Sequence, residues 1–136
     1  MTLFAVLDQT ANRFPDRGAV YHGRRPVCTW NDLRDRALRI AGSIRQQHGA
    51  GARIAIATHN RPEIFELIFG IWAAGCVVVP VNYKLHEREM ALILDDAGAS
   101  QVFASSKIGA ALGSGTSRTV ETIGSEAYSR RLGSAP

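Results

Sequence analysis

The stretch GIWAAGCVVVPVN, from Gly70 to Asn82, decides the fold. An apolar segment with helical spacing ends at a glycine and leads at once into the β-branched run 77–79. A strand without polar alternation is typical of a sheet that helices cover on both faces. Pro80 has no backbone N–H, so we expect this strand to leave its sheet at a bulge or to lie at an edge.

Similar segments lie on both sides of this stretch. The apolar runs RIAIAT and QVFAS precede and follow it, and segments with helical spacing join the three runs. Strands that alternate with helices of this length predict right-handed βαβ crossovers and a parallel sheet. We therefore expect an α/β fold, a parallel sheet with covering helices in a βαβαβ core. The expected strands are 53–58, 76–81 and 101–105, and the expected helices are 60–75 and 86–98.

The first of these helices carries signals at both ends. Asn60 is expected to cap it, with Pro62 in the first turn and Glu63 at the capping-box position. Gly75 is expected to end it, because glycine readily adopts the left-handed conformation that terminates helices.

A helix and a β-hairpin are expected before this core. Apolar residues recur at helical spacing over 3–14, with Thr2 as the cap, and GAVYHGRRPVCTW predicts two short strands around a Gly-Arg-Arg turn. Thr29 then predicts the start of a long helix, with Asp32 as its capping-box partner.

Two parts of the chain differ in character. Residues 1–107 are expected to form an N-terminal α/β subdomain, and residues 108–136 form a tail rich in Gly, Ser and Ala. Within the tail we expect a helix around 108–112, a strand at 119–123 and a helix around 126–132.

Composition and charge argue against several classes of protein. The 136 residues are 46% hydrophobic, enough for one core and too few for two. The net charge of +4 is scattered among acids without interleaved aromatic residues, so we expect no nucleic-acid partner. No apolar run is long enough to span a membrane, and the N-terminus lacks the pattern of a signal peptide. We therefore expect no membrane span and no signal peptide. Cys28 and Cys76 lie in apolar segments without metal-ligand spacing, which is typical of reduced thiols in a cytoplasmic protein.

Polar residues follow each expected strand of the core. In open parallel sheets, ligands bind beyond the carboxyl ends of the strands. The clusters at these positions are Thr58-His59-Asn60, Asn82-Tyr83-Lys84 and Ser105-Ser106-Lys107. The candidate cofactor-binding residues are His59, Asn60, Asn82 and Lys84. Each also has a purely structural interpretation: a helix cap for Asn60, loop hydrogen bonding for Asn82, and a surface position for His59 and Lys84.

The sequence supports no assignment of catalytic or metal-ligating residues. It has no Gly-x-Ser-x-Gly elbow, and its acids are typical of solvated helix faces. GSGTSR, from Gly113 to Arg118, is the more tempting of two Gly-rich stretches as a phosphate loop, but no lysine follows it. A flexible linker is the competing interpretation.

The middle of the chain resembles the AMP-forming acyl-CoA synthetases and other adenylate-forming enzymes. CTWNDLRDRALRIAGSIR is similar to their Thr-Tyr-x-Glu-Leu opening helix, with Trp30 and Asp32-Leu33 as variants. The segment after it shows, in the family's order, a strand, an Asn-x-x-Glu helix, an AAG turn, a VVPVN strand and a helix ending in LDDA. The resemblance covers roughly residues 3–106 and identifies an N-terminal subdomain of the adenylate-forming fold.

The resemblance implies a two-step ligase reaction for the parent enzyme. A carboxylic acid attacks the α-phosphate of ATP to give an acyl-adenylate and pyrophosphate, and the thiol of coenzyme A then displaces AMP. ATP, Mg²⁺ and CoA are the cofactors implied, and the motifs that hold them are not among these residues. We therefore expect the chain alone to be inactive and to bind none of them strongly. The Asn82 that follows VPV is typical of acyl- and aryl-CoA ligases. Amino-acid-activating relatives tend to have Asp at this position. The resemblance therefore favours an organic acid as substrate.

The resemblance also has consequences for partners. The remainder of the enzyme, or self-association, is expected to cover apolar surface that this part leaves exposed. Two alternatives remain open: a free-standing α/β binding or interaction module without catalysis, and a small nucleotide-binding domain that uses GSGTSR.

Overall fold

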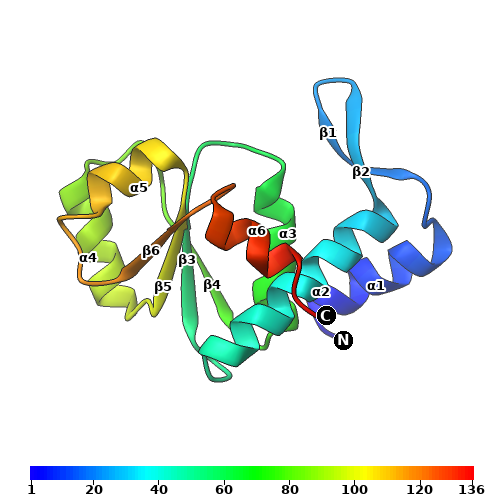
Figure 1. Cartoon of the computed structure of the whole chain (residues 1–136), viewed down its shortest axis with the longest axis horizontal. Helices are drawn as coiled ribbons and strands as arrows, with labels where there is room; N and C mark the ends of the chain where they lie inside the picture. Colours follow the sequence, from blue (N-terminus) through cyan, green and yellow to red (C-terminus); the bar gives the residue numbers. More distant parts are fainter.

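Four parallel strands form the centre of the computed structural model, which describes residues 1–136 (Figure 1). Helices lie on both faces of this sheet, and a two-stranded hairpin projects from one end of the molecule. The helices are α1 (Leu3–Arg13), α2 (Trp30–Gln47), α3 (Glu63–Ala73), α4 (Glu87–Ala97), α5 (Ser106–Leu112) and α6 (Glu126–Leu132). The strands are β1 (Gly18–His22), β2 (Arg25–Thr29), β3 (Arg53–Ala57), β4 (Val77–Pro80), β5 (Gln101–Ala104) and β6 (Thr119–Thr122).

The sheet has the strand order β4-β3-β5-β6, and all of its strand pairs are parallel. The predicted α/β fold with a βαβαβ core is therefore confirmed, and β6 from the Gly- and Ser-rich segment adds a fourth strand. The chain passes from β3 outward to β4, returns to the other side of β3 as β5, and continues to β6. This change of direction makes the carboxyl ends of β3 and β5 a topological switch point.

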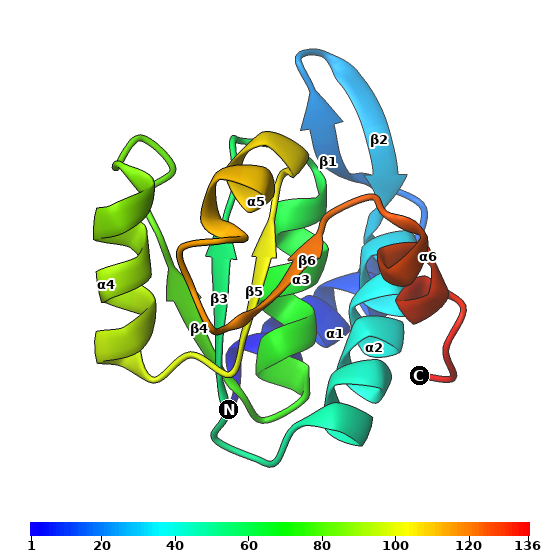
Figure 2. The same cartoon turned by 60° about the vertical axis from the view of Figure 1, so that its left-hand side comes forward.

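Two cores lie on opposite faces of the sheet. Helices α2, α3 and α6 cover one face, and α4 and α5 cover the other (Figure 2). On β3, Ile54 and Ile56 belong to the first core, whereas Ala55 and Ala57 belong to the second. The side chains of a strand point alternately to its two faces, so burial of both faces explains why this strand is apolar throughout.

Helices α2 and α3 cross closely at Gly70. A Cβ atom at this position would lie 2.7 Å from Cγ2 of Ile40 and 3.0 Å from the carbonyl oxygen of Ala37. The carbonyl belongs to the α2 backbone, so it cannot move without the helix. Leu67 and Ile71, on the same helix as Gly70, are fully buried against the sheet. The absent side chain of Gly70 thus permits the approach that buries these neighbours.

We expect Gly70→Ala to lower the free energy of unfolding by about 1–3 kcal/mol, because overpacking outweighs the roughly 1 kcal/mol that alanine gains in helix propensity. Urea denaturation followed by circular dichroism measures the change. Gly109→Ala on α5 is the matched control, since the nearest atom to its added Cβ would be 3.5 Å away. A neutral or stabilising Gly70→Ala would show that the helices do not need this close crossing.

The hairpin and α1 form a smaller unit beside the sheet. Strands β1 and β2 are antiparallel and turn at Gly23, which has a φ of 62°. Only the base of the hairpin is packed, through a separate small core with α1 and α2 that consists of Leu7, Val20, Leu33 and Ala37. The predicted first helix and hairpin are confirmed.

The helix starts agree with the sequence at α2 and differ at α3. The Thr29 hydroxyl accepts a hydrogen bond from the Asp32 N–H, and the Asp32 carboxylate accepts one from the Thr29 N–H, so the predicted capping box is confirmed. The prediction that Asn60 caps the next helix is wrong. Helix α3 begins at Glu63, with Pro62 at the N-cap and no side-chain cap. The fixed φ of proline suits a helix start without a capping hydroxyl or amide.

Pro80 lies on the edge strand β4, which pairs only with β3. The N–H groups of Val77 and Val81 donate hydrogen bonds to carbonyl oxygens on the β3 side, at 2.8 and 2.9 Å. Because successive N–H groups of a strand alternate in direction, the missing donor of Pro80 falls on the open side. The expected edge position is confirmed, and Pro80 removes a donor with which another strand would pair.

Two further observations concern the cysteine thiols and the hydrophobicity of the helices. Cys28 and Cys76 are free thiols, and burial raises the pKa of both. None of the helices combines the length and the apolar character that crossing a bilayer requires.

Candidate functional site

The carboxyl ends of β3, β4 and β5 bring three side chains together. His59 follows β3, Tyr83 follows β4 and Ser105 follows β5. The Nδ1 atom of His59 lies 3.4 Å from Oγ of Ser105, and the rings of His59 and Tyr83 have centroids 4.5 Å apart. The segments that follow the three predicted strands thus lie together at one edge of the sheet. We call the loops that follow the strands at this edge the carboxyl edge.

Ser105 explains how the imidazole is held. This residue occupies the N-cap of α5, yet its hydroxyl makes no hydrogen bond to the helix. A serine at an N-cap usually accepts a bond from a backbone N–H of the first turn. Here the hydroxyl contacts His59 instead, from a position that is 9% exposed. One ring nitrogen of His59 is thus fixed on the protein side, while its residue remains exposed at the surface.

The loop after β4 adds a positive charge. The Oδ1 atom of Asn82 accepts a hydrogen bond from the Lys84 N–H at 3.0 Å, so the expected loop role of Asn82 is confirmed. The Lys84 ammonium group lies 6.0 Å from the centroid of the Tyr83 ring, at the outer limit of a cation–π contact. The residue is exposed, so its charge is available next to the aromatic pair.

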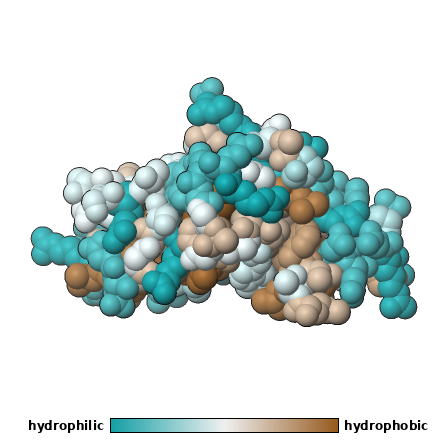
Figure 3. Space-filling model, turned by 90° about the horizontal axis from the view of Figure 1, so that it is seen from below, coloured by the Kyte–Doolittle hydropathy of each residue, from teal (hydrophilic) through white to brown (hydrophobic).

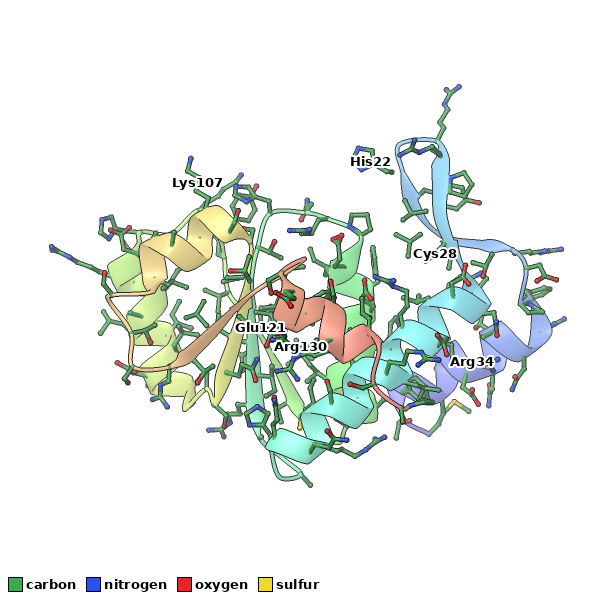
Figure 4. All side chains as sticks on the ribbon, in the orientation of Figure 1. His22, Cys28, Arg34, Lys107, Glu121 and Arg130 are labelled. Carbon is green, nitrogen blue, oxygen red and sulfur yellow. The ribbon has the colours of Figure 1, made fainter.

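The remaining members of the three clusters do not join this group. Thr58 is buried, and its hydroxyl donates to the carbonyl oxygen of His59 at 3.0 Å. Asn60 is exposed and its side chain makes no hydrogen bond. Lys107 lies on α5 and projects away from the fold (Figure 4). Of the candidate residues, His59 and Lys84 both lie beside Tyr83 and Asn82 bonds Lys84, whereas the Asn60 side chain makes no such contact.

Arg61 also belongs to the carboxyl edge, although the sequence did not identify it as a candidate residue. Its Nη2 atom would lie 3.5 Å from a Cβ atom on Gly124, which follows β6, so the side chain extends from the β3 loop to the end of β6. Its Nε atom pairs with Oε2 of Glu63 at 2.6 Å. Burial acts to raise the pKa of Glu63, but the bond from Arg61 helps to hold it below its usual value. These opposite charges, two residues apart, are visible in the sequence, whereas the reach of Arg61 toward β6 depends on the conformation of the loop.

The geometry of the carboxyl edge suits binding better than covalent catalysis. The side chain of His59 has one hydrogen bond, to Ser105, and no carboxylate orients it as in a catalytic triad. No group of three or more His, Cys, Asp or Glu side chains is placed to hold a metal ion. An imidazole, a phenol ring and an ammonium group in contact can stack on a planar ligand and pair with an anionic one.

The Gly-rich stretch 113–118 lies at the opposite edge of the sheet, between the end of α5 and the start of β6. The Arg118 guanidinium donates to the carbonyl oxygen of Ala99 at 3.0 Å and contacts the Asp95 carboxylate. A phosphate loop leads from the carboxyl end of a strand into a helix, but this stretch leads from a helix into a strand. Its position argues against the small nucleotide-binding alternative.

None of the three main hollows of the surface is lined by His59, Tyr83 or Ser105. The largest of these three, of about 430 Å³, is formed by β2, α2 and the start of α3, next to the loop that follows β3. Arg36 and Glu66 line it and form two hydrogen bonds with each other, at 2.8 and 2.9 Å. The group of His59, Tyr83 and Ser105 is therefore an open surface, and a ligand there would need a second wall.

Comparison with known proteins decides the family. Residues 7–131 match the family described as AMP-binding enzyme. The chain belongs to the AMP-binding enzyme family. The resemblance to adenylate-forming acyl-CoA ligases that the sequence predicted is thus confirmed.

Among the curated relatives of this AMP-binding chain are two acyl-CoA ligases. The peroxisomal acetate/butyrate–CoA ligase AAE7 of Arabidopsis thaliana is 32% identical over 103 residues, which cover 75% of this chain and 18% of the ligase. The long-chain-fatty-acid–CoA ligase of Bacillus subtilis is 33% identical over 104 residues, which cover 74% of this chain and 18% of the ligase. The chain thus spans about a fifth of the length of these relatives.

Solved structures show the same fold. The N-terminal domain of FACL13 from Mycobacterium tuberculosis has a TM-score of 0.88 at 24% identity and covers all of this chain, which in turn covers 37% of that domain's chain. A long-chain-fatty-acid CoA ligase from Rhodopseudomonas palustris has a TM-score of 0.79 at 33% identity, over 91% of this chain and 33% of the other. The fold is that of the N-terminal subdomain of adenylate-forming enzymes.

Proposed function

We propose that this chain forms the first layer of an ATP-dependent acyl-CoA ligase. In this reaction a carboxylate displaces pyrophosphate from ATP to give an acyl-adenylate, and the thiol of coenzyme A then displaces AMP to give a thioester. The observation that carries the proposal is the family match over residues 7–131, together with acyl-CoA ligases as its relatives. ATP, Mg²⁺ and CoA would be bound by the parent ligase, and the chain alone would be inactive.

The proposed substrate is an organic acid. Asn82 follows the VPV sequence, a position at which amino-acid-activating relatives tend to carry Asp. In the structure its amide holds the loop that carries Lys84. The names of the relatives point the same way, since they describe ligases of acetate, butyrate and long-chain fatty acids. We place the protein in the cytoplasm, in agreement with its two free thiols.

Within the ligase, the carboxyl edge would face the ligands. It lies at the topological switch point of the sheet, where open α/β sheets bind their ligands. His59, Tyr83 and Lys84 present rings and a positive charge there, and the edge lacks a second wall. The remainder of a ligase would supply that wall.

Exposed apolar side chains offer a surface to the remainder of the enzyme. Leu3 and Val6 on α1 and Phe65 on α3 are 58%, 49% and 48% exposed. Helices α1 and α3 pack side by side, and Figure 3 shows hydrophobic surface gathered on the part of the lower face over which these helices lie. Contiguous apolar surface of this kind is typical of a site covered by another protein segment. We propose that the rest of the ligase covers it.

A chimera tests the proposal. Residues 7–131 replace the matching segment of the Bacillus subtilis long-chain-fatty-acid–CoA ligase, and acyl-CoA formation is measured with ATP, Mg²⁺, CoA and a series of carboxylic acids. We expect the chimera to form acyl-CoA and the isolated chain to form none. Phe65→Ser should reduce the yield of soluble active chimera, whereas Leu92→Ser, at a still more exposed apolar position on α4, should not. A folded chimera without adenylation activity would contradict the proposal and favour a binding module.

A further inference from the structure

The hairpin arm, residues 21–27, is an unused surface that the ligase proposal does not involve. All of its residues are exposed, including the large apolar side chains of Tyr21 at 53% and Val27 at 47%. Figures 1 and 2 show the arm extending beyond the helices on either side. Two-stranded hairpins are only marginally stable when uncovered, and exposed apolar residues on such an element indicate a contact surface.

The tip of the arm carries unpaired positive charge. Arg24 and Arg25 form no ion pair or side-chain hydrogen bond, and His22 pairs across the strands with Arg25. Figure 4 shows His22 near the outer end of the arm. Nothing in the chain itself neutralises this end of the hairpin.

The base of the same hairpin is hollowed and acidic. Hollows of about 430 and 320 Å³ lie on either side of β2 and share Val27, Cys28 and Asp32. We call them together the base groove. Its carboxylates are Asp16, Asp32, Asp35, Glu63 and Glu66, and its one guanidinium is that of Arg36.

Part of this acidic charge is free to attract a cation. Asp35, Glu63 and Glu66 have arginine partners, but Asp16 and Asp32 have none. Asp32 accepts the Thr29 N–H in the capping box, and this backbone hydrogen bond lowers its pKa, so it is a carboxylate at neutral pH. The hairpin thus joins a positive end to a negative end over the length of two short strands.

We propose that two copies of this chain pair through their hairpin arms, side by side and antiparallel, with each basic tip in the base groove of the other copy. A two-fold axis perpendicular to two equal hairpins places the tip of each hairpin beside the base of the other. The same symmetry therefore forms both tip–groove contacts. The contact is isologous, and each charge interaction occurs twice. Tyr21 and Val27, midway along the arm, meet their counterparts near the axis. An arm of this size makes a small interface, and the dimer is weak and reversible.

Sedimentation velocity over a range of protein concentrations tests the pairing in the 136-residue chain. We expect a monomer–dimer equilibrium that weakens as NaCl rises from 50 to 500 mM, because the contact is electrostatic. Apolar association through α1 and α3 would strengthen or stay constant with salt. Arg24→Glu/Arg25→Glu should raise the dissociation constant at least about tenfold, since like charges then face each other twice. Arg88→Glu/Lys107→Glu changes the net charge equally on exposed residues of α4 and α5 and should leave it unchanged.

A charge swap separates pairing from misfolding. Together with Arg39 and Arg61, which pair with Asp35 and Glu63, the groove carries a net charge of −2, and Asp16→Lys/Asp35→Lys changes it to +2. The altered groove should repel the basic tip of its own kind. Mixed with Arg24→Glu/Arg25→Glu, it should form a heterodimer, because both tip–groove contacts are then attractive. Recovery of dimer in the mixture supports the proposal. A monomer at all concentrations, a dimer insensitive to the Arg24 and Arg25 changes, or no recovery in the mixture overturns it. None of these outcomes bears on the chimera's ligase activity.

Discussion

Replacement of Arg131 by methionine is expected to lower the free energy of unfolding by roughly 3–5 kcal/mol, because it leaves a buried carboxylate without its partner. The Arg131 side chain is 7% exposed and its partner Glu121 is 12% exposed. Two of its nitrogens bond the two carboxylate oxygens, at 2.8 and 3.0 Å. The guanidinium also donates to Ser43 and Gln47 on α2, so the loss would separate α6 from the rest of the core.

The adjacent residue provides the control. Arg130 pairs with Glu126, but these side chains are 69% and 89% exposed, so Arg130→Met should change stability by less than about 0.5 kcal/mol. The double variant Arg131→Met/Glu121→Leu should recover part of the loss, because no charge then remains buried. Thermal and urea unfolding of the four proteins give the comparison. Similar losses for Arg131→Met and Arg130→Met would show that the buried network does not hold α6.

Arg36→Met is expected to cost about 3 kcal/mol at pH 7 and distinctly less at pH 5. Its partner Glu66 is buried, with 5% of the side chain exposed, whereas Arg36 itself is 41% exposed. Burial raises the pKa of Glu66 above its usual value, although Arg36 acts to lower it. The hydroxyl of Tyr128 is buried nearby without a hydrogen-bond partner, and burial raises its pKa as well, so it remains neutral. Removal of Arg36 therefore leaves Glu66 without its ion-pair partner.

The pH dependence follows from the direction of this shift. Because the pKa of Glu66 in the folded protein lies above that of the unfolded chain, stability falls as pH rises from the unfolded value toward the folded one. Without Arg36 the folded pKa rises further and this fall is steeper. Urea titrations at pH 5, 6 and 7 measure it. Glu66→Gln should cost less than about 1 kcal/mol, since water can solvate the half-exposed Arg36. A cost of Arg36→Met that does not change between pH 5 and 7 would exclude an ionised, uncompensated Glu66.

Local signals in the sequence predicted most of the fold. The capping box of Thr29 and Asp32 depends on residues three apart, and it formed as expected. Asn60 shows where such signals fail: a good capping residue stands near a helix start, but the chain first crosses the end of the sheet and begins α3 at Glu63. The strand at 119–123 was visible as a pattern, but its pairing with β5 depends on packing of Tyr128 and Arg131 that no local signal shows.

Part of the candidate site could likewise be predicted from the sequence and part could not. The rule that ligands bind beyond the carboxyl ends of parallel strands pointed to the three clusters that contain His59, Tyr83 and Ser105, because it depends only on topology. Two other contacts depend on side-chain directions that the spacing of residues in the sequence does not encode. The Ser105 hydroxyl points to His59 and not to its own helix, and Arg61 extends to Gly124. The network of Arg131 joins residues up to 88 positions apart, and no sequence pattern marks them.

Hydrogen–deuterium exchange of the chimeric ligase, with and without ATP, Mg²⁺ and a carboxylic acid, tests most directly whether the carboxyl edge faces the ligands. We expect ligands to slow exchange of the amides in 58–61, 82–85 and 105–107. The loops at the opposite edge, 49–52, 98–100 and 113–118, serve as the control within the same molecule and should exchange at unchanged rates. Protection confined to those opposite loops, or no protection in a chimera that forms acyl-CoA, would contradict the account.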